Sequence, residues 1–136
     1  MKSETKIWLD YAEENLKSSK ILLDNQLYNP SLQNAQQSVE KSLKAIVIEH
    51  GINLKRTHDI LELKYLLQRK GIIVNISDDE CDLLNAIYLP SKYPMGDTTE
   101  EISPDEELCH ISIDIAEKVF ASAIDLINWL ISLTPT

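Results

Sequence analysis

Apolar residues recur at three- and four-residue steps along most of this chain, and that spacing constrains the fold more than any other feature. One face of an α-helix collects positions at this spacing, so each such stretch predicts an amphipathic helix. The first runs from about Glu4 to Gln26, and its apolar residues are Ile7, Trp8, Tyr11, Ala12, Leu16, Leu22 and Leu23.

Two further helices follow with recognisable ends. Asn29 and Pro30 suit a helix start, because asparagine caps helices and proline is tolerated in the first turn. Gly51 is expected to end this second helix. The third is predicted from about His58 to Lys70, with Thr57 as its cap and Gly71 as its stop.

The second half of the chain predicts two more helices. Residues 72–74 have strand-like composition but no partner strand, so an extended linker is expected. Ser77 to Glu80 has the pattern of a capping box, which starts a short helix to about Ile87. A second box is predicted at residues 103–106, before a final helix of about 30 residues.

Residues 89–102 form the longest connection without a helical pattern. Proline disfavours helical geometry in the residue before it, so Pro90 and Pro94 predict an extended chain past Lys92 and Tyr93. Long loops often carry function, but tyrosines beside prolines also pack over the ends of bundles. Both interpretations of this segment stay open.

Helices with one apolar stripe each and no competing strands most simply form a bundle. We therefore predict an all-α, antiparallel up-and-down bundle of four to five helices, occupying residues 1–136 as one domain. A chain of 136 residues is long enough to bury a core without a metal or a disulfide.

Composition limits the partners. The net charge of −9 argues against broad, nonspecific binding to nucleic acid, although seven of the basic residues fall between Lys41 and Lys70. Cys81 and Cys109 lack ligand spacing, and no apolar leader follows Met1, so a reducing, cytoplasmic setting is expected. No stretch is apolar and long enough to span a membrane.

Few residues carry chemical signals. Arg56 and His58 could bind phosphate and support acid–base chemistry, although a lone histidine beside an arginine is more often an ordinary loop. Gln36, Glu40 and Lys44 lie one helical turn apart, and a solvated face with an ion pair is the expected interpretation. No metal, nucleophile or phosphate-loop motif occurs, so neither a metal nor a cofactor is predicted.

Taken in order, the motifs resemble one known family. They are Trp8-Leu9-x-x-Ala12-x-x-Asn15-Leu16, Asn29-Pro30, Ala35-Gln36-Gln37-x-x-Glu40-Lys41-x-Leu43-Lys44-Ala45, Gly51, Arg56-Thr57-His58-Asp59-Ile60-x-x-Leu63 and Tyr88-x-x-Ser91-Lys92-Tyr93-Pro94. The chain is similar over nearly its whole length to HEPN (higher eukaryotes and prokaryotes nucleotide-binding) domains.

This resemblance implies a helical bundle that forms a homodimer and is often encoded beside a minimal nucleotidyltransferase as a toxin–antitoxin pair. Many such domains are metal-independent ribonucleases with an arginine followed after four to six residues by histidine. That spacing is absent here, and Lys92 stands where the related motif has arginine. The sequence leaves open whether the chain is an enzyme, and the missing motif argues against ribonuclease activity.

Three functions follow from these observations. The first is a dimeric subunit that binds a nucleotide or the nucleotidyltransferase, through Gln37, Lys41, Lys44, Lys55, Arg56, His58, Lys92 and Tyr93. The second is a ribonuclease toxin with an atypical site, for which Arg56 and His58 are the catalytic candidates. The third is a purely structural helical interaction module. Lys92 and Tyr93 are predicted to lie near the connection from Lys55 to His58.

Overall fold

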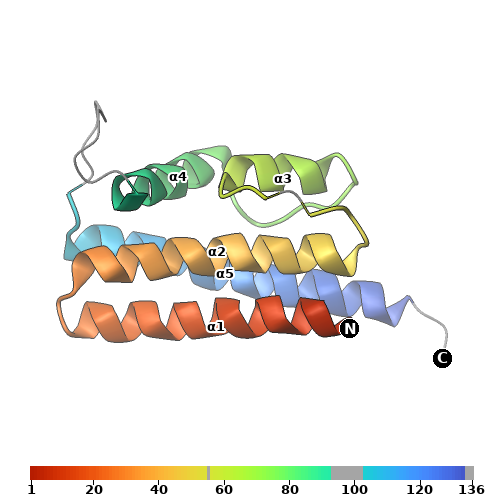
Figure 1. Ribbon diagram of the computed structural model, residues 1–136, viewed down its shortest axis with the longest axis horizontal. Coiled ribbons are helices and arrows are strands. Elements are labelled where there is room, and N and C mark those ends of the chain that lie inside the picture. The colour runs from red at the N-terminus through yellow and green to blue at the C-terminus, as the bar shows by residue number, and fades with distance from the viewer. Residues whose placement is uncertain (55, 93–102, 134–136) are drawn as a thin grey trace.

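The computed structural model describes residues 1–54, 56–92 and 103–133, with residues 89–92 described by their backbone alone. This part of the chain contains helices and no strands (Figure 1). The helices are α1 (Ser3–Asp24), α2 (Tyr28–Glu49), α3 (Ile60–Gln68), α4 (Asp78–Lys92) and α5 (Glu106–Ser132). The prediction of an all-α bundle is confirmed.

Helix α2 is the centre of the bundle and packs against each of the other four helices. Helix α1 runs antiparallel to it: the backbone N–H of Lys2 donates to Glu49 at one end, and Ser19 and Ser31 exchange hydrogen bonds at the other. Helix α5 runs in the same direction as α2, since its first turn places Cys109 against the carbonyl of Tyr28.

Helix α3 is an extra helix beside the other four, which alternate in direction. The chain after α2 returns along that helix before α3 begins, because His58 lies beside Glu40 in the middle of α2. Helix α3 then runs in the same direction as α2, and its end lies beside His50. Helix α4 turns back again, so that α1, α2, α4 and α5 alternate in direction, as an up-and-down bundle requires (Figure 1).

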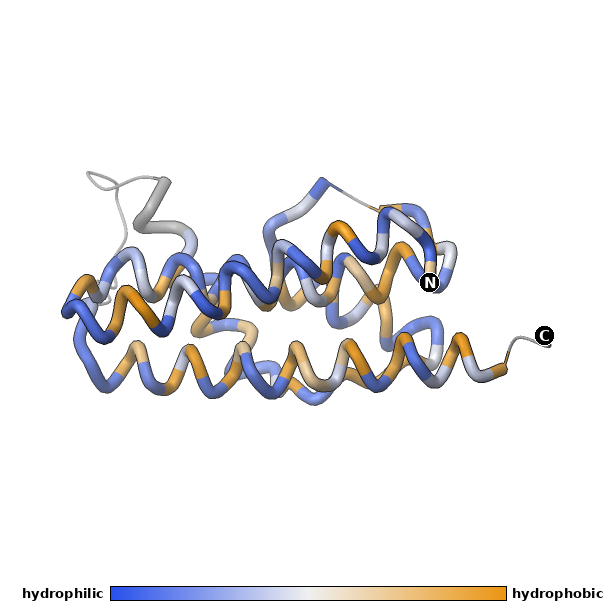
Figure 2. Tube along the Cα trace, turned by 90° about the horizontal axis from the view of Figure 1, so that it is seen from below, coloured by the Kyte–Doolittle hydropathy of each residue, from blue (hydrophilic) through white to orange (hydrophobic). Residues whose placement is uncertain are grey.

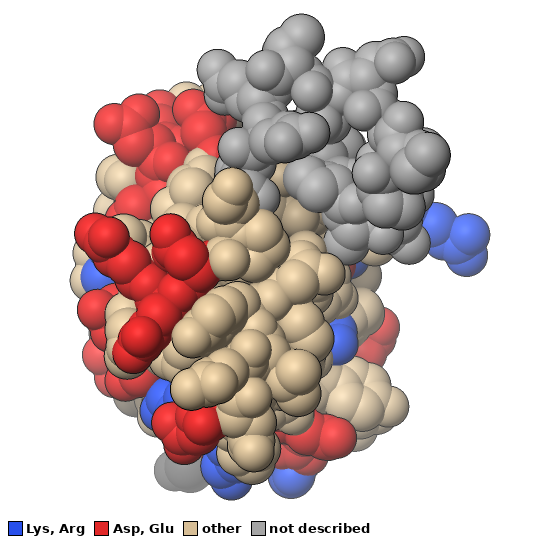
Figure 3. All heavy atoms as spheres, turned by 90° about the vertical axis from the view of Figure 1, so that its left-hand side faces the viewer, with Lys and Arg blue, Asp and Glu red and all other residues tan. Residues whose placement is uncertain are grey.

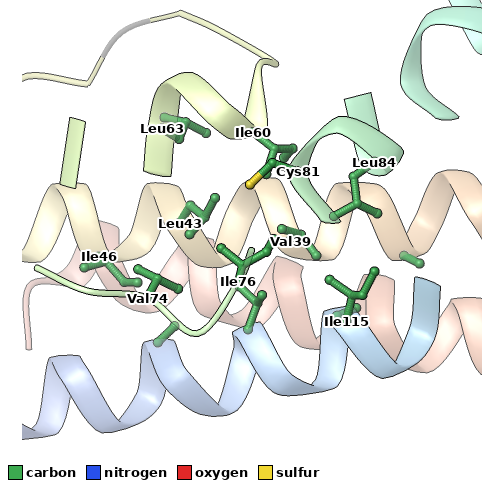
Figure 4. Close-up of a cluster of buried hydrophobic side chains, with 14 of the residues drawn as sticks. Val39, Leu43, Ile46, Ile60, Leu63, Val74, Ile76, Cys81, Leu84 and Ile115 are labelled. Carbon is green, nitrogen blue, oxygen red and sulfur yellow. The ribbon is translucent and has the colours of Figure 1, made fainter. Parts of the chain in front are cut away.

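The core fills the space between α2, α5 and the α3–α4 pair, as Figure 4 shows. Residues 72–74 form neither helix nor strand, as predicted for a linker, and Val74 and Ile76 insert between α2 and α5. Hydrophobic positions recur along each helix and alternate with hydrophilic ones (Figure 2). The expected stripe of α1 is partly wrong, because Ile7 and Tyr11 are 52% and 51% exposed while Leu9, Ala12 and Leu16 face the core.

The start of α4 agrees with the sequence, whereas the starts of α2, α3 and α5 shift. The capping box of α4 is confirmed: the Ser77 hydroxyl accepts from the Glu80 N–H at 3.1 Å, and the Glu80 carboxylate accepts from the Ser77 N–H at 2.9 Å. The predicted cap at Asn29 is wrong, because α2 begins at Tyr28 and Asn29 lies inside it. Helix α5 is capped by Asp105 and α3 by Asp59, not by residues 103 and 57. In both, a carboxylate accepts backbone N–H groups of the first turn, which favours aspartate as the cap.

The end of α4 contradicts the extended chain predicted for residues 89–92. The helix continues through Pro90 to Lys92. Near a helix end, proline removes one hydrogen bond rather than a whole ladder, and the packing of Leu84 and Ile87 into the core holds the helix in place. Tyr93 and the rest of the predicted loop to residue 102 lie outside the described residues.

Candidate functional site

Glu40 is a buried carboxylate at the centre of a polar network. It lies in the middle of α2 and is only 2% exposed. Its oxygens accept hydrogen bonds from His58 Nδ1 at 3.0 Å, from Lys44 Nζ at 3.0 Å and from Gln36 Nε2 at 3.5 Å. A buried charge is tolerable only when it is paired and hydrogen-bonded, and these three donors meet that requirement.

The expected solvated face on α2 is therefore wrong, although the predicted ion pair forms. The side chains of Lys44 and Glu40 are 8% and 3% exposed. Trp8 of α1 covers the pair from one side, with its ring centroid 5.5 Å from Lys44 Nζ, and His58 covers it from the other. Helical spacing predicts which residues share a face, but packing of other elements decides whether that face meets water.

His58 is held by Glu40 at one ring nitrogen and is half-exposed. Because the Glu40 carboxylate accepts the hydrogen bond, Nδ1 carries the proton and Nε2 is the nitrogen directed away from Glu40. The His58 side chain is 54% exposed. Its ring also stacks on Tyr88 of α4, with centroids 4.8 Å apart and an interplanar angle of 25°. The predicted helix start at this residue is wrong, since α3 begins at Ile60.

A small pocket of about 250 Å³ adjoins the two stacked rings. It is lined by His58, Asp59, Asn85 and Tyr88. Two hydrogen bonds hold Asn85 in place. Its Oδ1 accepts from the Ile60 N–H at 2.9 Å, and its Nδ2 donates to Asp59 Oδ1 at 2.8 Å. The pocket thus combines two aromatic rings with one polar edge.

The cations predicted for this site are only partly described. Arg56 is exposed and makes no hydrogen bond or ion pair with the residues that the structure describes. Lys55 and Tyr93 lie outside the described residues. Lys92 ends α4 one helical turn after Tyr88, and its side chain is not described. The backbone of α4 therefore approaches the connection 56–59, as the shared-site prediction requires, but the side chains at 55, 92 and 93 are not placed.

The three predicted site residues on α2 have other partners. Gln37 donates to Gln36 Oε1 at 2.7 Å and so belongs to the edge of the Glu40 network. Lys44 uses its charge on Glu40. Lys41 turns toward α1, where it donates to Asn15 Oδ1 at 2.7 Å and lies 5.5 Å from the centroid of the Tyr11 ring; burial lowers its pKa below the ordinary value.

Some residues of the site were not among the predicted ones. They are Glu40, Asp59, Asn85 and Tyr88. The spacing of Glu40 between Gln36 and Lys44 was visible in the sequence, but nothing in it indicated burial. Tyr88 and Asn85 join the site because α4 packs against the start of α3, which is a tertiary contact with no local pattern.

The rest of the described structure offers weaker sites. A wider hollow of about 580 Å³ lies at the far end of α2, but it is an open surface where His50 Nδ1 already bonds the Ile46 carbonyl. Among the described residues, no three metal-binding side chains come together and no helix could span a membrane. Burial raises the pKa of Cys81 to about 11, so that thiol stays protonated near neutral pH.

Charge is divided unevenly over the surface. Figure 3 shows the end of the bundle at which α5 begins, where acidic side chains clearly outnumber basic ones. The described acids there include Asp105, Glu106, Glu107 and Asp114, which line one shallow hollow. An anionic ligand would be repelled from this end, which favours the Arg56–His58 surface for such a ligand.

Known proteins with similar sequences carry toxin names. The chain is 41% identical over 51 residues to the Methanocaldococcus jannaschii protein named Putative toxin MJ1304, a match that covers 38% of this chain and 34% of that protein. It is 29% identical over 63 residues to Putative toxin MJ0605 of the same organism, covering 46% and 47% respectively. The matches thus span less than half the length of each relative.

Solved structures extend the similarity over almost the whole chain. ST0689, an archaeal HEPN homologue, superposes with a TM-score of 0.67 at 25% identity over 93% of this chain and 99% of that one. TT1696 from Thermus thermophilus gives a TM-score of 0.72 at 22% identity, over 92% and 99%, and supports the fold alone. The sequence model of the family described as HEPN domain matches residues 5–126 of this chain. This chain therefore belongs to the HEPN domain family.

Proposed function

We propose that this chain is the HEPN subunit of a toxin–antitoxin-type pair, and that it binds a nucleotide through the surface around His58. In this proposal the protein is a homodimer, and its partner is a minimal nucleotidyltransferase that presents or consumes the nucleotide. The observation that carries the proposal is the half-exposed His58, which is held by buried Glu40, stacks on Tyr88 and lies two residues from the exposed Arg56.

These groups suit a nucleotide chemically. A guanidinium matches phosphate oxygens in a two-pronged hydrogen bond, and an imidazole nitrogen adds a donor when it is protonated. Aromatic rings stack on bases of any sequence. Because Glu40 fixes the His58 ring, little side-chain freedom remains to be lost on binding, which favours affinity.

Titration with AMP, ATP and a short single-stranded RNA tests this function. Arg56→Ala and His58→Ala should each weaken binding about tenfold or more, the typical value of a charge-assisted hydrogen bond. His110→Ala is the matched control, since the His110 side chain is 62% exposed, against 54% for His58, and pairs with Glu106 on α5. If no ligand binds, and the nucleotidyltransferase from the neighbouring reading frame does not copurify, the proposal fails and a structural module remains.

The homodimer has its own measurement. Sedimentation velocity of the purified protein at micromolar concentration should give the mass of two chains, twice 15.5 kDa. A single 15.5 kDa species across the concentration range would contradict this part of the proposal.

A ribonuclease is the second candidate, and one observation favours it. A carboxylate that orients an imidazole through Nδ1, and leaves Nε2 without a hydrogen bond to the described residues, is the usual arrangement of a general base. His58 would then take a proton from the ribose 2′-hydroxyl, and Arg56 would bind the phosphate. Without added metal, the protein should cleave RNA, and His58→Ala should slow cleavage at least about 100-fold. Equal survival of RNA with wild type and variant removes this candidate.

A further inference from the structure

We propose that the pocket formed by His58, Asp59, Asn85 and Tyr88 receives the base of the bound nucleotide and prefers bases with an exocyclic amino group. This inference rests on the proposed function, because it assumes that a nucleotide binds beside His58. It adds which part of the ligand enters the pocket, which bases are favoured and which residue selects them.

The size of the pocket favours one flat ring system. Pockets for drug-sized ligands usually measure about 300–1,000 Å³. This one measures about 250 Å³, so a whole nucleotide does not fit but a base does. The ribose and phosphate would then lie outside, toward the exposed side of the connection 56–58, where Arg56 is located.

The aromatic part of the lining is already assembled. His58 and Tyr88 stack on each other at 4.8 Å, and Glu40 fixes the imidazole through Nδ1. Because each ring already restricts the other, a base that contacts them inside the pocket orders few additional rotatable bonds. Stacking on an aromatic side chain typically contributes about 1–3 kcal/mol per base.

Asp59 supplies a polar edge with one oxygen left over. Its Oδ1 accepts three hydrogen bonds, from the Leu61 and Glu62 N–H groups at 3.0 and 3.2 Å and from Asn85 Nδ2 at 2.8 Å. Its Oδ2 accepts none from the described residues. The orientation of Asn85 is fixed as well, since its Oδ1 must face the Ile60 N–H.

A carboxylate oxygen can only accept hydrogen bonds, so it selects bases that offer N–H donors. Adenine, cytosine and guanine each carry an exocyclic amino group, whereas the one N–H donor of uracil in a nucleotide, N3–H, lies between two carbonyl oxygens. A carbonyl opposite Oδ2 would place two acceptors against each other. The pocket should therefore favour the three amino bases over uracil.

Isothermal titration of the full chain with AMP, CMP, UMP and ribose 5-phosphate tests this inference. Wild type should bind AMP and CMP about tenfold or more tightly than UMP, the cost of one unmet hydrogen bond. Ribose 5-phosphate should bind most weakly. Tyr88→Leu should lower AMP affinity roughly five- to hundredfold, while Tyr88→Phe keeps the ring and should change it little.

Asp59→Asn gives the sharpest comparison. Asparagine caps a helix as well as aspartate does, so α3 should be preserved, but the outward oxygen becomes an amino donor. The preference for AMP over UMP should fall at least fivefold or reverse. Asp105→Asn alters the corresponding cap of α5 and should leave the preference unchanged. The preference of the wild-type protein for AMP over UMP is measured without any variant, so it tests the inference even if a variant unfolds.

The outcomes separate this inference from the function on which it rests. If all four ligands bind equally and Arg56→Ala weakens them equally, the nucleotide site stands and the base pocket is wrong. An unchanged preference in Asp59→Asn, with the variant folded, also overturns the role of Asp59. If none of the four ligands binds, both the inference and the proposed nucleotide site fail.

Discussion

Glu40 makes three contacts, two with residues of α2 and one with the segment before α3. It pairs with Lys44 along α2, receives Gln36 from the preceding turn and anchors His58 from the connection 50–59. Removing one partner of a buried pair leaves the other charge unpaired and costs far more than the pair itself contributes. The stability of variants at Glu40 and Lys44 therefore reports whether this pair is buried.

Glu40→Gln should lower the free energy of unfolding by about 3–5 kcal/mol, because Lys44 remains buried without its carboxylate. Glu40→Leu combined with Lys44→Met should cost clearly less than Glu40→Gln alone, since no buried charge remains. Urea unfolding followed by circular dichroism measures both. The exposed pair Lys6–Asp10 is the control, and Asp10→Asn should cost less than about 1 kcal/mol. Equal losses for Glu40→Gln and Asp10→Asn would contradict a buried pair.

Glu80 links two helices at the start of α4. It completes the capping box with Ser77 and accepts two hydrogen bonds from Lys118 of α5, at 2.7 and 2.8 Å. Burial by itself would raise the pKa of Glu80, but the hydrogen bonds from Lys118 and Ser77 outweigh it and hold the pKa below its ordinary value. Its ionised form is therefore the one that the folded helix pair stabilises.

Acid should weaken this link. A carboxyl whose pKa is lower in the folded state stabilises the fold above its unfolded pKa, and the contribution is lost as the pH falls through the folded pKa. Wild type should therefore lose more stability than Glu80→Gln when the pH drops from about 6 to about 3. Glutamine keeps a capping box possible but cannot pair with Lys118 as a charge. Parallel pH profiles for the two proteins, from thermal unfolding, would show that Glu80 makes no such contribution.

At the scale of the whole molecule, net charge and local charge act in opposite directions. The chain carries −9 overall, whereas the proposed site offers Arg56, with Lys55 and Lys92 as further candidates from the sequence. Affinity for single-stranded nucleic acid falls with salt in proportion to the number of phosphates neutralised, with a slope of about −0.7 per phosphate. Three cations can neutralise at most three phosphates, so the magnitude of the slope has a small upper limit.

The logarithm of RNA affinity against the logarithm of salt concentration should therefore have a slope of no more than about 2 in magnitude. Arg56→Ala should reduce that slope by about 0.7, and Lys20→Ala, on the opposite α1–α5 face beside Glu117, should leave it unchanged. Fluorescence anisotropy with a labelled oligonucleotide between about 50 and 300 mM salt gives the slope, because charge screening changes strongly over this range. A slope near about 6 would indicate a broad basic surface that the net charge of this chain argues against.

The sequence by itself determined the five helices, their approximate ends and the all-α fold, because helical periodicity, caps and glycine stops are local signals. It also determined that His58 and Arg56 are the residues to examine, through their chemistry and the HEPN-like motifs. It misplaced the end of α4, since one proline near a helix end costs less than the core contacts of Leu84 and Ile87 provide.

Only the tertiary structure decided that Glu40 and Lys44 are buried, that His58 is anchored and that Tyr88 and Asn85 belong to the same site. Burial depends on which elements cover a face, and here Trp8 and His58 arrive from segments 32 residues before and 18 residues after Glu40. Contacts between residues so far apart in the sequence produce no periodic pattern from which they could be predicted. The residue types were visible in the sequence, but their assembly into one site followed from packing.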